Sequence, residues 1–468
     1  MGQEDIDRLS GYYRKKTNRR FGDRWKKGHN LNRYGGERIF LYGLLVCVSL
    51  LIVGSLLAAV LPGKPELHKK VELKKKEEIQ GPKQEIDNPN IRVLIMTNGY
   101  ANTVHPSVEV SSETGLTVTC GEEQQEIEAG QTLVVAPDDE RFQNGSIRIC
   151  AHDGGEVAIH SIQRGYGTPA YAGTLELRTT AEGIAVINEL PVETYLCKVV
   201  PSEMPASYEL EALKAQAVCA RSYAYQQMQD YAYPEYEAHV NDSTDYQVYG
   251  NSAAQASSSQ AVEETSGEVV RYQGQVVTTY YYSTSCGRTT SLEAWGTAGN
   301  EGNQYLQAVE VKDEEGDYEK ELPWYRWTAA IPVETLSNLI GLNTGQDVGT
   351  LQSVEVTKTG PGSVALQICA TGDKGMVTVD TENKIRRALG GSGYEICKQD
   401  GTTVASSALL PSAFFTIRRE GDVFVIEGGG YGHGIGMSQN GANEMAKKGK
   451  NYVDILTLFF HNITIEGA

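Results

Sequence analysis

A single carboxylate, Glu203, stands between Pro201 and Pro205, directly ahead of a helical sequence. Each proline fixes its own φ angle and disfavours helical backbone in the residue before it, so we expect Glu203 on a stiff, extended turn. A carboxylic acid with a raised pKa can deliver a proton to the leaving oxygen of a glycosidic bond. A carboxylate at this place can also merely complement the dipole of the following helix, and the residues alone do not separate the two roles.

The helix after this carboxylate is expected to begin near Ser207, a good N-cap residue. Leu210, Leu213 and the alanines beyond them recur at helical spacing, and the opposite side is apolar as well, which is typical of a buried helix. Lys214 and Arg221 lie two turns apart on one side of it. Arg221 has three open roles: a surface or ion-pair residue on the helix, a contact to a carboxylate or N-acetyl oxygen of a glycan, or a residue that orients Glu203.

A glycine-rich loop, residues 428–436, precedes a short helix near the C-terminal end. It lacks the following Gly-Lys-Ser/Thr of a phosphate loop, which disfavours nucleotide binding. The glycines are better explained by a close backbone approach to a sugar or to the Glu203 turn. His433 in this loop is either a satisfied structural histidine or a contact to substrate or Glu203. Gln439 either caps the helix or binds a sugar hydroxyl.

A third polar segment, residues 283–289, reads Ser-Thr-Ser-Cys-Gly-Arg-Thr. Ser285, Arg288 and Thr289 can line a cleft, although an ordinary polar turn would have the same composition. Cys286 and His433 have the types of a nucleophile and its base, but nothing near either residue supports that pairing.

Charge is unevenly spread along the 468 residues, whose formal net charge is −18. Residues 1–38 carry 11 Lys/Arg against 5 Asp/Glu, so the part after residue 90 is strongly acidic. A nucleic-acid partner needs a basic face, and this composition argues against one.

Residues 39–61 form an uncharged apolar run that is long enough to span a bilayer. The basic segment before it predicts an N-terminus in the cytoplasm and everything after residue 61 outside, so we expect a single-pass membrane protein. A cleaved signal peptide is the rival interpretation, but its apolar core and basic region are usually shorter. Residues 62–90 are a charged linker.

Short strands separated by Gly, Asn and Asp turns begin at Ile91, and the order of elements is strand-rich with inserted helices. We therefore predict an α+β ectodomain, with a β-rich N-terminal lobe at 91–170 and the catalytic region at 171–468. Two short helices should end the chain. The first runs from Ser438 to a stop at Gly449, and the second starts at Asn451 with Asp454 at the capping position.

Seven cysteines follow the apolar run. Cys120 with Cys150, and Cys369 with Cys397, could form disulfides, although the sequence cannot fix the pairing. No CxxC occurs, and the polar loop 239–250 offers only His239 and two aspartates, Asp242 and Asp245, which make a poor zinc site. We predict no metal and no cofactor.

The stretch 201–224 resembles the signature of the stage II sporulation protein D family, in its Pro-Ser-Glu-Met-Pro and in the Leu-Glu-Ala-Leu-Lys-Ala-Gln-Ala-Val-x-Ala-Arg-Ser-Tyr-Ala that follows. That family includes lytic transglycosylases of the bacterial cell wall and the related amidase enhancers. The resemblance is strongest at 188–225, 280–296 and 424–442. It implies that Glu203, which falls on the position of the family's catalytic glutamate, is the catalytic residue. The residues expected to bind substrate are Arg221, Lys214, Gln247, Tyr249, Ser285, Arg288, Thr289, His433 and Gln439.

The resemblance further implies a membrane-anchored lytic transglycosylase that cleaves the β-1,4 bond between N-acetylmuramic acid and N-acetylglucosamine and leaves a 1,6-anhydromuramic end. The implied partners are peptidoglycan glycan strands, a cell-wall amidase and a membrane protein of the engulfment machinery in sporulation. Two departures stand out: Cys286 replaces the usual glycine, and residues 241–246 lack the Cys and His that bind zinc in some members. The alternative function is a non-catalytic glycan-binding protein that stimulates an amidase.

Overall fold

The computed structural model describes residues 88–468. The expected basic tail and membrane segment, and nearly all of the charged linker, lie outside this part. Within it, no helix is both long and apolar enough to cross a membrane. The described part is strand-rich with several helices, and the predicted α+β class is confirmed for it.

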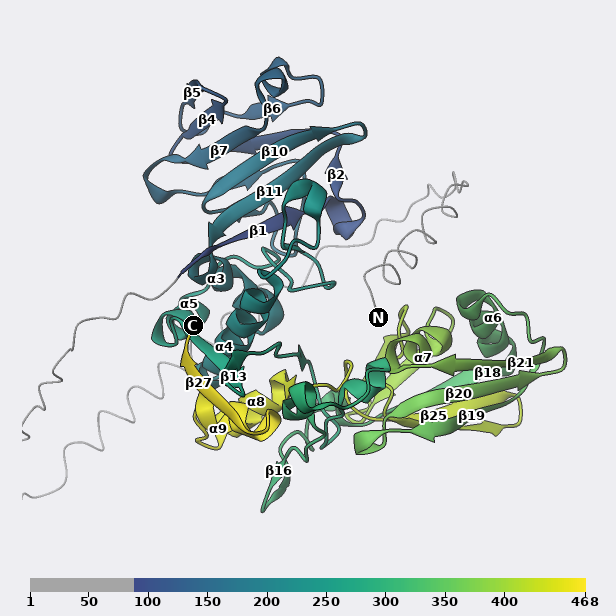
Figure 1. Cartoon of the computed structure of the whole chain (residues 1–468). Coiled ribbons are helices and arrows are strands. Elements are labelled where there is room, and N and C mark those ends of the chain that lie inside the picture. Colours follow the sequence, from purple (N-terminus) through teal and green to yellow (C-terminus); the bar gives the residue numbers. More distant parts are fainter. Residues whose placement is uncertain (1–87) are drawn as a thin grey trace, which may run out of the picture. The chain divides into compact units, whose positions relative to one another are not determined.

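One large sheet organises the first half of the described chain (Figure 1). Its strand order is β12-β1-β11-β10-β7-β4-β5, antiparallel except where β12 joins β1, and β2 also pairs with β11. The strands are β1 (Asn90–Ile95), β2 (Val104–His105), β4 (Leu116–Cys120), β5 (Glu123–Ile127), β7 (Ile147–Ala151), β10 (Thr174–Thr180), β11 (Gly183–Pro191) and β12 (Val240–Asn241). The sheet continues across residue 170, so the expected boundary between lobe and catalytic region falls inside one structural unit.

A smaller sheet in the same region has the order β6-β3-β8-β9. Its strands are β3 (Val108–Ser111), β6 (Leu133–Val135), β8 (Val157–Ile159) and β9 (Ala170–Tyr171). Alternate residues of β3 and β4 are buried, as expected for strands with one face on a core. Most buried apolar side chains of both sheets join those of the helices that follow in one core. Leu94, Ala185 and Ile187 of the large sheet form a smaller cluster of their own with Ala238.

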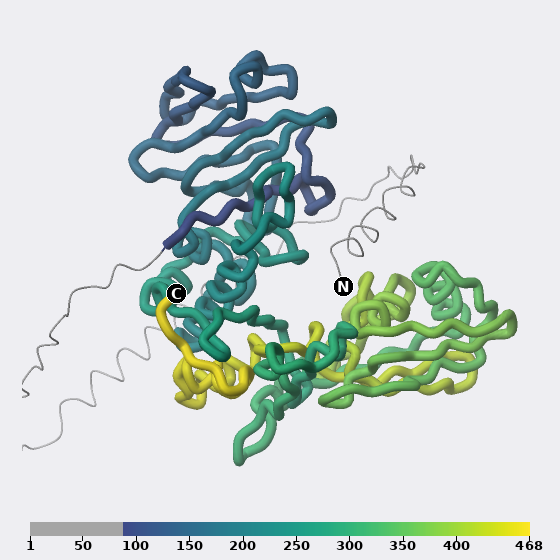
Figure 2. Tube along the Cα trace, in the orientation of Figure 1, coloured from purple at the N-terminus to yellow at the C-terminus, as the bar shows by residue number. Residues whose placement is uncertain are grey.

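The central helices are α3 (Val192–Glu203), α4 (Leu210–Gln227) and α5 (Ala256–Glu264), and all three contact one another. Helix α4 is rich in alanine, which lets its neighbours approach closely, and it also contacts α8 (Gln439–Lys447) and α9 (Tyr452–Phe459) from the other end of the chain (Figure 2). A sheet of β14 (Gln275–Val276), β13 (Glu268–Tyr272) and β27 (Ile463–Gly467) brings the C-terminal strand to the same region. The central helix is buried, as its apolar pattern predicts.

The start of α4 differs from the expectation. The helix begins at Leu210 with Glu209 as its N-cap residue, two positions after Ser207, the expected N-cap. The reason is a turn ahead of it, in which the Tyr208 amide donates to the Pro205 carbonyl at 3.0 Å. The Glu209 amide, which the helix leaves free, donates to Asn443 Oδ1 at 2.9 Å.

Residues 327–428 form two further sheets with two helices. Their strand orders are β23-β22-β18-β25-β24 and β19-β20-β21, and α6 and α7 pack on them (Figure 1). The elements are β18 (Trp327–Pro332), α6 (Val333–Thr344), β19 (Leu351–Thr359), β20 (Ala365–Gly372), β21 (Gly375–Asp380), α7 (Glu382–Leu389), β22 (Glu395–Lys398), β23 (Thr403–Ala405), β24 (Phe415–Glu420) and β25 (Val423–Gly428).

The caps expected for the last two helices are confirmed. Ser438 caps α8 by accepting from the Gly441 amide, and Asn451 and Asp454 form a capping box at α9.

The suggested disulfides are not formed, and all seven cysteines of the described part are free thiols. Cys120 lies opposite Ile147, and Cys150 opposite Thr117, at different ends of the paired strands β4 and β7. Cys369 and Cys397 belong to different sheets, on β20 and β22. The pairs suggested by sequence order are therefore separated by strand register and by sheet.

Arg221 holds the three central helices together. Its guanidinium is completely buried and binds both carboxylate oxygens of Glu193 on α3, at 2.6 and 2.7 Å. The same group donates to the carbonyls of Val262, on α5, and Glu268, at 3.2 and 3.0 Å. Because the guanidinium is completely buried and its donors face Glu193 and these carbonyls, the ion-pair role left open for Arg221 is the one that the geometry supports.

Replacement of Arg221 by Met should lower the free energy of unfolding by about 3–5 kcal/mol, since Glu193 and two carbonyls lose their buried partner. Urea denaturation of the full-length protein measures this, with the exposed Arg288→Met as the matched control that should change it little. A loss below about 1 kcal/mol for Arg221→Met would show that the fold does not depend on this ion pair.

Candidate active site

Glu203 is the last residue of α3, and Pro201 lies inside the final turn of that helix. The expectation of an extended turn at Glu203 is therefore wrong. A proline in the last turn of a helix disturbs fewer backbone hydrogen bonds than one in the middle, so it is tolerated here. The backbone becomes extended only at Met204. The half-buried Glu203 side chain thus leaves the C-terminal end of a helix, whose partial negative charge disfavours a carboxylate.

The carboxyl group of Glu203 has neutral hydrogen-bond donors around it. The Val248 amide donates to Oε1 at 2.6 Å, and the Tyr281 hydroxyl also bonds the carboxyl. Burial raises the pKa of Glu203 from its ordinary 4.5 to about 7, although both hydrogen bonds lower it. No arginine or lysine of residues 88–468 forms an ion pair with this carboxyl group. At neutral pH, Glu203 is therefore protonated in a large fraction of the molecules.

Tyr281, on the short strand β15 (Tyr281–Tyr282), is held at both ends. Its hydroxyl accepts from Gln247 Nε2 at 3.1 Å, which leaves the hydroxyl proton for Glu203. Gln247 is itself buried and bonds the Ala220 carbonyl and the Tyr195 hydroxyl. The predicted substrate-binding residue Gln247 therefore lies one hydrogen-bonded step from Glu203 and orients its partner.

His433 fixes the other end of Tyr281. Its Nε2 donates to the Tyr281 carbonyl at 2.9 Å, while its Nδ1 accepts from the Ile435 amide at 3.1 Å. Burial lowers the pKa of His433 to about 3, so the ring stays neutral and acts neither as acid nor as base near pH 7. Because both ring nitrogens are used within the loop and β15, the pairing of Cys286 with His433 does not occur.

Gln439 and the glycine-rich loop bring the C-terminal segment to the site. Gln439, the first residue of α8, donates from Nε2 to the Glu203 carbonyl at 3.0 Å. Gly436 has a positive φ, and a Cβ there would lie 2.1 Å from the Tyr280 carbonyl. The loop thus needs glycine to approach β15. Gln439 was expected to cap the helix or to bind a sugar hydroxyl. Ser438 is the cap of α8, whereas the Gln439 side chain donates to the backbone of Glu203, and its binding of a sugar stays a prediction.

Three half-buried aromatic side chains form a row that begins near Glu203. The sequence did not lead us to predict them as site residues. Tyr223 of α4 meets Tyr280 edge to face, and Tyr280 meets Trp295 in the same way at 4.8 Å between ring centroids. Burial raises the pKa of Tyr223, and the charge of Glu203 adds to this, which places the ring near the acid. The only signal in the sequence was that each ring lies inside or beside a segment already singled out.

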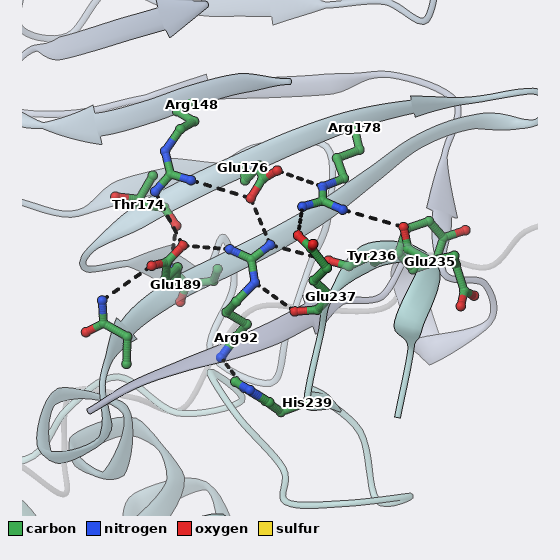
Figure 3. Close-up of polar contacts among 12 residues, drawn as sticks. Arg92, Arg148, Thr174, Glu176, Arg178, Glu189, Glu235, Tyr236, Glu237 and His239 are labelled. Atoms are coloured by element: carbon green, nitrogen blue, oxygen red, sulfur yellow. Dashed lines mark hydrogen bonds and ion pairs between the residues drawn. The ribbon is translucent and has the colours of Figure 1, made fainter. Parts of the chain in front are cut away.

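A charged network on the large sheet anchors the loop that supplies Val248 (Figure 3). Arg92 binds Glu189 and Glu176 at 2.6 and 2.8 Å, and its Nε donates to the Glu237 carbonyl. The Arg92 amide donates to His239 Nδ1 at 3.0 Å. The start of loop 239–250 is therefore fixed to β1.

A buried ion pair fixes the same loop further along. Asp242 and the Arg164 guanidinium are both fully buried and lie 2.6 Å apart, and Asp242 Oδ1 accepts from the Met96 amide. The Asp242 carbonyl accepts from the Tyr249 amide, next to Val248. The described residues contain no cluster of three potential metal ligands, and Asp242 and His239 are already occupied. The absence of a metal stays a prediction.

The other predicted substrate-binding residues lie in different surroundings. Lys214 forms ion pairs with Glu211 and Glu264, and Tyr249 is completely buried, with its hydroxyl on Asn188. Buried Ser285 and Thr289 bond protein groups, whereas Arg288 is exposed. Only Arg288 among these presents a side chain chiefly to solvent, and its substrate role stays a prediction.

The raised pKa of Glu203 has a measurable effect on stability. The folded state holds this proton up to pH about 7 and the unfolded chain only to about 4.5, so the stabilisation present below pH 4.5 is lost as the pH rises through 7. Glu203→Gln, which mimics the neutral acid, should equal the wild type at pH 4.5 and exceed it at pH 8 by up to about 3 kcal/mol. Urea unfolding at both pH values checks this, with the exposed Glu321→Gln as control. Equal stability of wild type and Glu203→Gln at pH 8 would contradict the raised pKa.

Comparison with known proteins agrees with this geometry. The family model described as Stage II sporulation protein matches residues 180–272, and a Domain of unknown function (DUF8618) matches 297–436. Stage II sporulation protein D of Bacillus amyloliquefaciens is 30% identical over 298 residues, which covers 60% of this chain and 76% of that protein. Its counterpart in Bacillus subtilis is 29% identical over 321 residues, with 64% and 83% covered.

An amidase enhancer of Bacillus subtilis is also similar, with 30% identity over 299 residues that cover 57% of this chain and 39% of that protein. The residues matched by the Stage II sporulation protein model include the segment that carries Glu203 and α4. On these grounds the chain belongs to the stage II sporulation protein D family, whose members include cell-wall hydrolases, and it is related to amidase enhancers.

Proposed function

We propose that this protein is a peptidoglycan lytic transglycosylase with Glu203 as its acid and base. The supporting observation is the protonated character of Glu203, whose pKa burial raises to about 7 beside neutral donors. A general acid works best when its pKa lies near the working pH. The substrate would be the β-1,4 bond between N-acetylmuramic acid and N-acetylglucosamine in glycan strands.

In the proposed reaction, Glu203 gives its proton to the glycosidic oxygen as the bond from that oxygen to the muramic C1 breaks. The C6 hydroxyl of the same muramic acid then attacks C1 and returns a proton to the Glu203 carboxylate, which leaves a 1,6-anhydro end. The Val248 amide and the Tyr281 hydroxyl stabilise the carboxylate between the two steps. One carboxyl group is enough, because the substrate supplies the nucleophile.

The aromatic rings beside the acid suit a sugar chain. Tyr223, Tyr280 and Trp295 are each partly exposed, and ring faces of this kind pack against the apolar faces of pyranose rings. They provide apolar contact area, while the backbone and Arg288 offer polar groups for the hydroxyl and N-acetyl substituents.

A role in sporulation beside a cell-wall amidase is part of the proposal, and it is supported by the names of the relatives. Anchoring by residues 39–61, with the rest of the chain outside the cytoplasm, completes it and rests on the charge pattern alone.

The similarity to an amidase enhancer favours a second candidate, a glycan-binding protein that stimulates an amidase without cleaving glycan itself. It would use the same aromatic residues but would not need the Glu203 proton. The two candidates therefore differ in whether Glu203→Gln changes the outcome.

Full-length protein should convert purified glycan strands to fragments with 1,6-anhydromuramic ends, and Glu203→Gln should lower this rate at least a thousandfold, since the acid is lost. Mass spectrometry of the products measures it. Asp245→Asn is the matched control, because Asp245 is an exposed carboxylate that also acts on the pKa of Tyr223. Hydrated reducing ends that vanish in Asp245→Asn would indicate a hydrolase. Glycan binding without cleavage would favour the amidase-stimulating candidate.

The cleavage rate should fall about tenfold per pH unit above pH about 7, because the acid must be protonated. The Tyr281 hydroxyl bond lowers the pKa of Glu203, so Tyr281→Phe should move this decline upward by about one pH unit. The same variant should lower the maximal rate, since the carboxylate formed on proton transfer loses a donor. A pH profile of kcat/KM checks both, and a downward shift would contradict the proposed hydrogen bond.

A further inference from the structure

We propose that Glu319 is a positioning residue, whose buried carboxyl fastens the end of β15 to the start of α8 and so holds Tyr281 and Gln439 against Glu203. The inference rests on the proposed function for the catalytic role of Glu203. Glu319 belongs to the region matched by the Domain of unknown function model, outside the segment matched by the Stage II sporulation protein model.

Glu319 follows the hairpin of β16 (Lys312–Asp313) and β17 (Gly316–Asp317) and is completely buried. Its Oε1 accepts from the Ser285 amide and from Ser438 Oγ, both at 2.8 Å. Its Oε2 accepts from Ser285 Oγ. A buried carboxyl is costly without partners, and here three donors from two segments converge on it.

These donors are the only partners of the Glu319 carboxyl group among the ion pairs and hydrogen bonds seen in residues 88–468, and none of them is a cation. Burial raises the pKa of Glu319 to about 7. A side chain that serves only to balance charge would face an arginine or lysine. Glu319 instead accepts hydrogen bonds from Ser285 and Ser438. It therefore joins the two backbone segments to which these serines belong.

The first serine, Ser285, lies three residues after the end of β15. Residues 281 and 282 of β15 pair in parallel with Met437 and Ser438 of β26 (Met437–Ser438). This pairing has only two residues on each strand, so it needs support from beyond its ends. Ser285 receives that support from Glu319, which fixes the strand that presents Tyr281 to Glu203.

The second serine, Ser438, is the N-cap residue of α8. Ser438 accepts from the Gly441 amide as the N-cap of the helix, and its hydroxyl proton goes to Glu319. The next residue, Gln439, donates to the Glu203 carbonyl. Glu319 therefore acts on Glu203 from both sides, through Tyr281 on the side chain and through Gln439 on the backbone.

Removal of the carboxyl should disturb Glu203 through Tyr281. We expect Glu319→Ala to lower kcat/KM on glycan strands at least tenfold, with a smaller change in KM than in kcat. We expect Glu319→Gln to retain most of the activity, because its amide oxygen keeps the Ser285 amide and Ser438, and its amide group can donate to Ser285 Oγ. The exposed Glu315→Ala, on the same hairpin, is the matched control and should equal the wild type.

A double-mutant cycle with Tyr281→Phe separates positioning from a general loss of structure. If Glu319 acts on Glu203 in part through Tyr281, the double variant should lose clearly less activity than the product of the two single losses. Losses that multiply would overturn the proposal, and so would full activity of Glu319→Ala. If Glu319→Ala fails to fold, Ser438→Ala removes one of the three donors and enters the same cycle with the same criteria.

A second measurement does not depend on activity. The titration of Glu203 can be followed by its carboxyl 13C signal in the full-length protein, assigned by its loss in Glu203→Gln. Glu319→Ala should move the midpoint in the direction that Tyr281→Phe gives, and the double variant should move it no further. An unchanged midpoint in Glu319→Ala would overturn the proposal. If the wild type cleaves no glycan, the proposed function fails while this titration still decides the role of Glu319.

Discussion

The burial of one carboxyl group without a cation is the constraint on which the site depends. Glu203 keeps its proton near neutral pH because burial raises its pKa and its contacts are an amide and a phenol, not a cation. An arginine in direct contact would lower the pKa well below that range. The two cations on the neighbouring helix are both occupied elsewhere: Arg221 by Glu193, and Lys214 by two glutamates. Their ion pairs stabilise the helices and at the same time leave the acid without a counter-ion.

The donors that reach Glu203 come from parts of the chain far apart in sequence. Val248 lies in a loop anchored to the large sheet, Tyr281 on β15, and Gln439 at the start of α8. Each anchor is a buried polar contact with a defined geometry, such as the Arg164 ion pair in the loop or the carboxyl of Glu319 beside β15. A position that three separate segments determine is rigid, which is what proton transfer to a bound sugar requires.

Local signals in the sequence predicted the parts of the fold that depend on local contacts. The buried helix, the caps at Ser438 and Asn451 and the α+β class follow from spacing and residue type. The flanking prolines singled out Glu203, but they also suggested an extended turn. That prediction was wrong, because tertiary packing allows α3 to continue through Pro201 and to end at Glu203. The partner of Arg221, 28 residues away, and the donors of Glu319, 34 and 119 residues away, could not be read from the sequence because tertiary structure alone brings them together.

The same burial that suits Glu203 to acid catalysis works against the fold. Above pH about 7 the carboxyl must ionise in a poorly solvated place, and Glu319, with its pKa also near 7, adds a second carboxyl of this kind. A site of this sort persists only if the surroundings supply the stability that it lacks. Here they do so with apolar and aromatic contacts, such as the buried ring of Tyr249, next to Val248 in sequence, which packs against Tyr171 and Tyr195. The loop and helix that present Glu203 are therefore stabilised by this packing together with their buried ion pairs, and both offset the cost of the buried carboxyl.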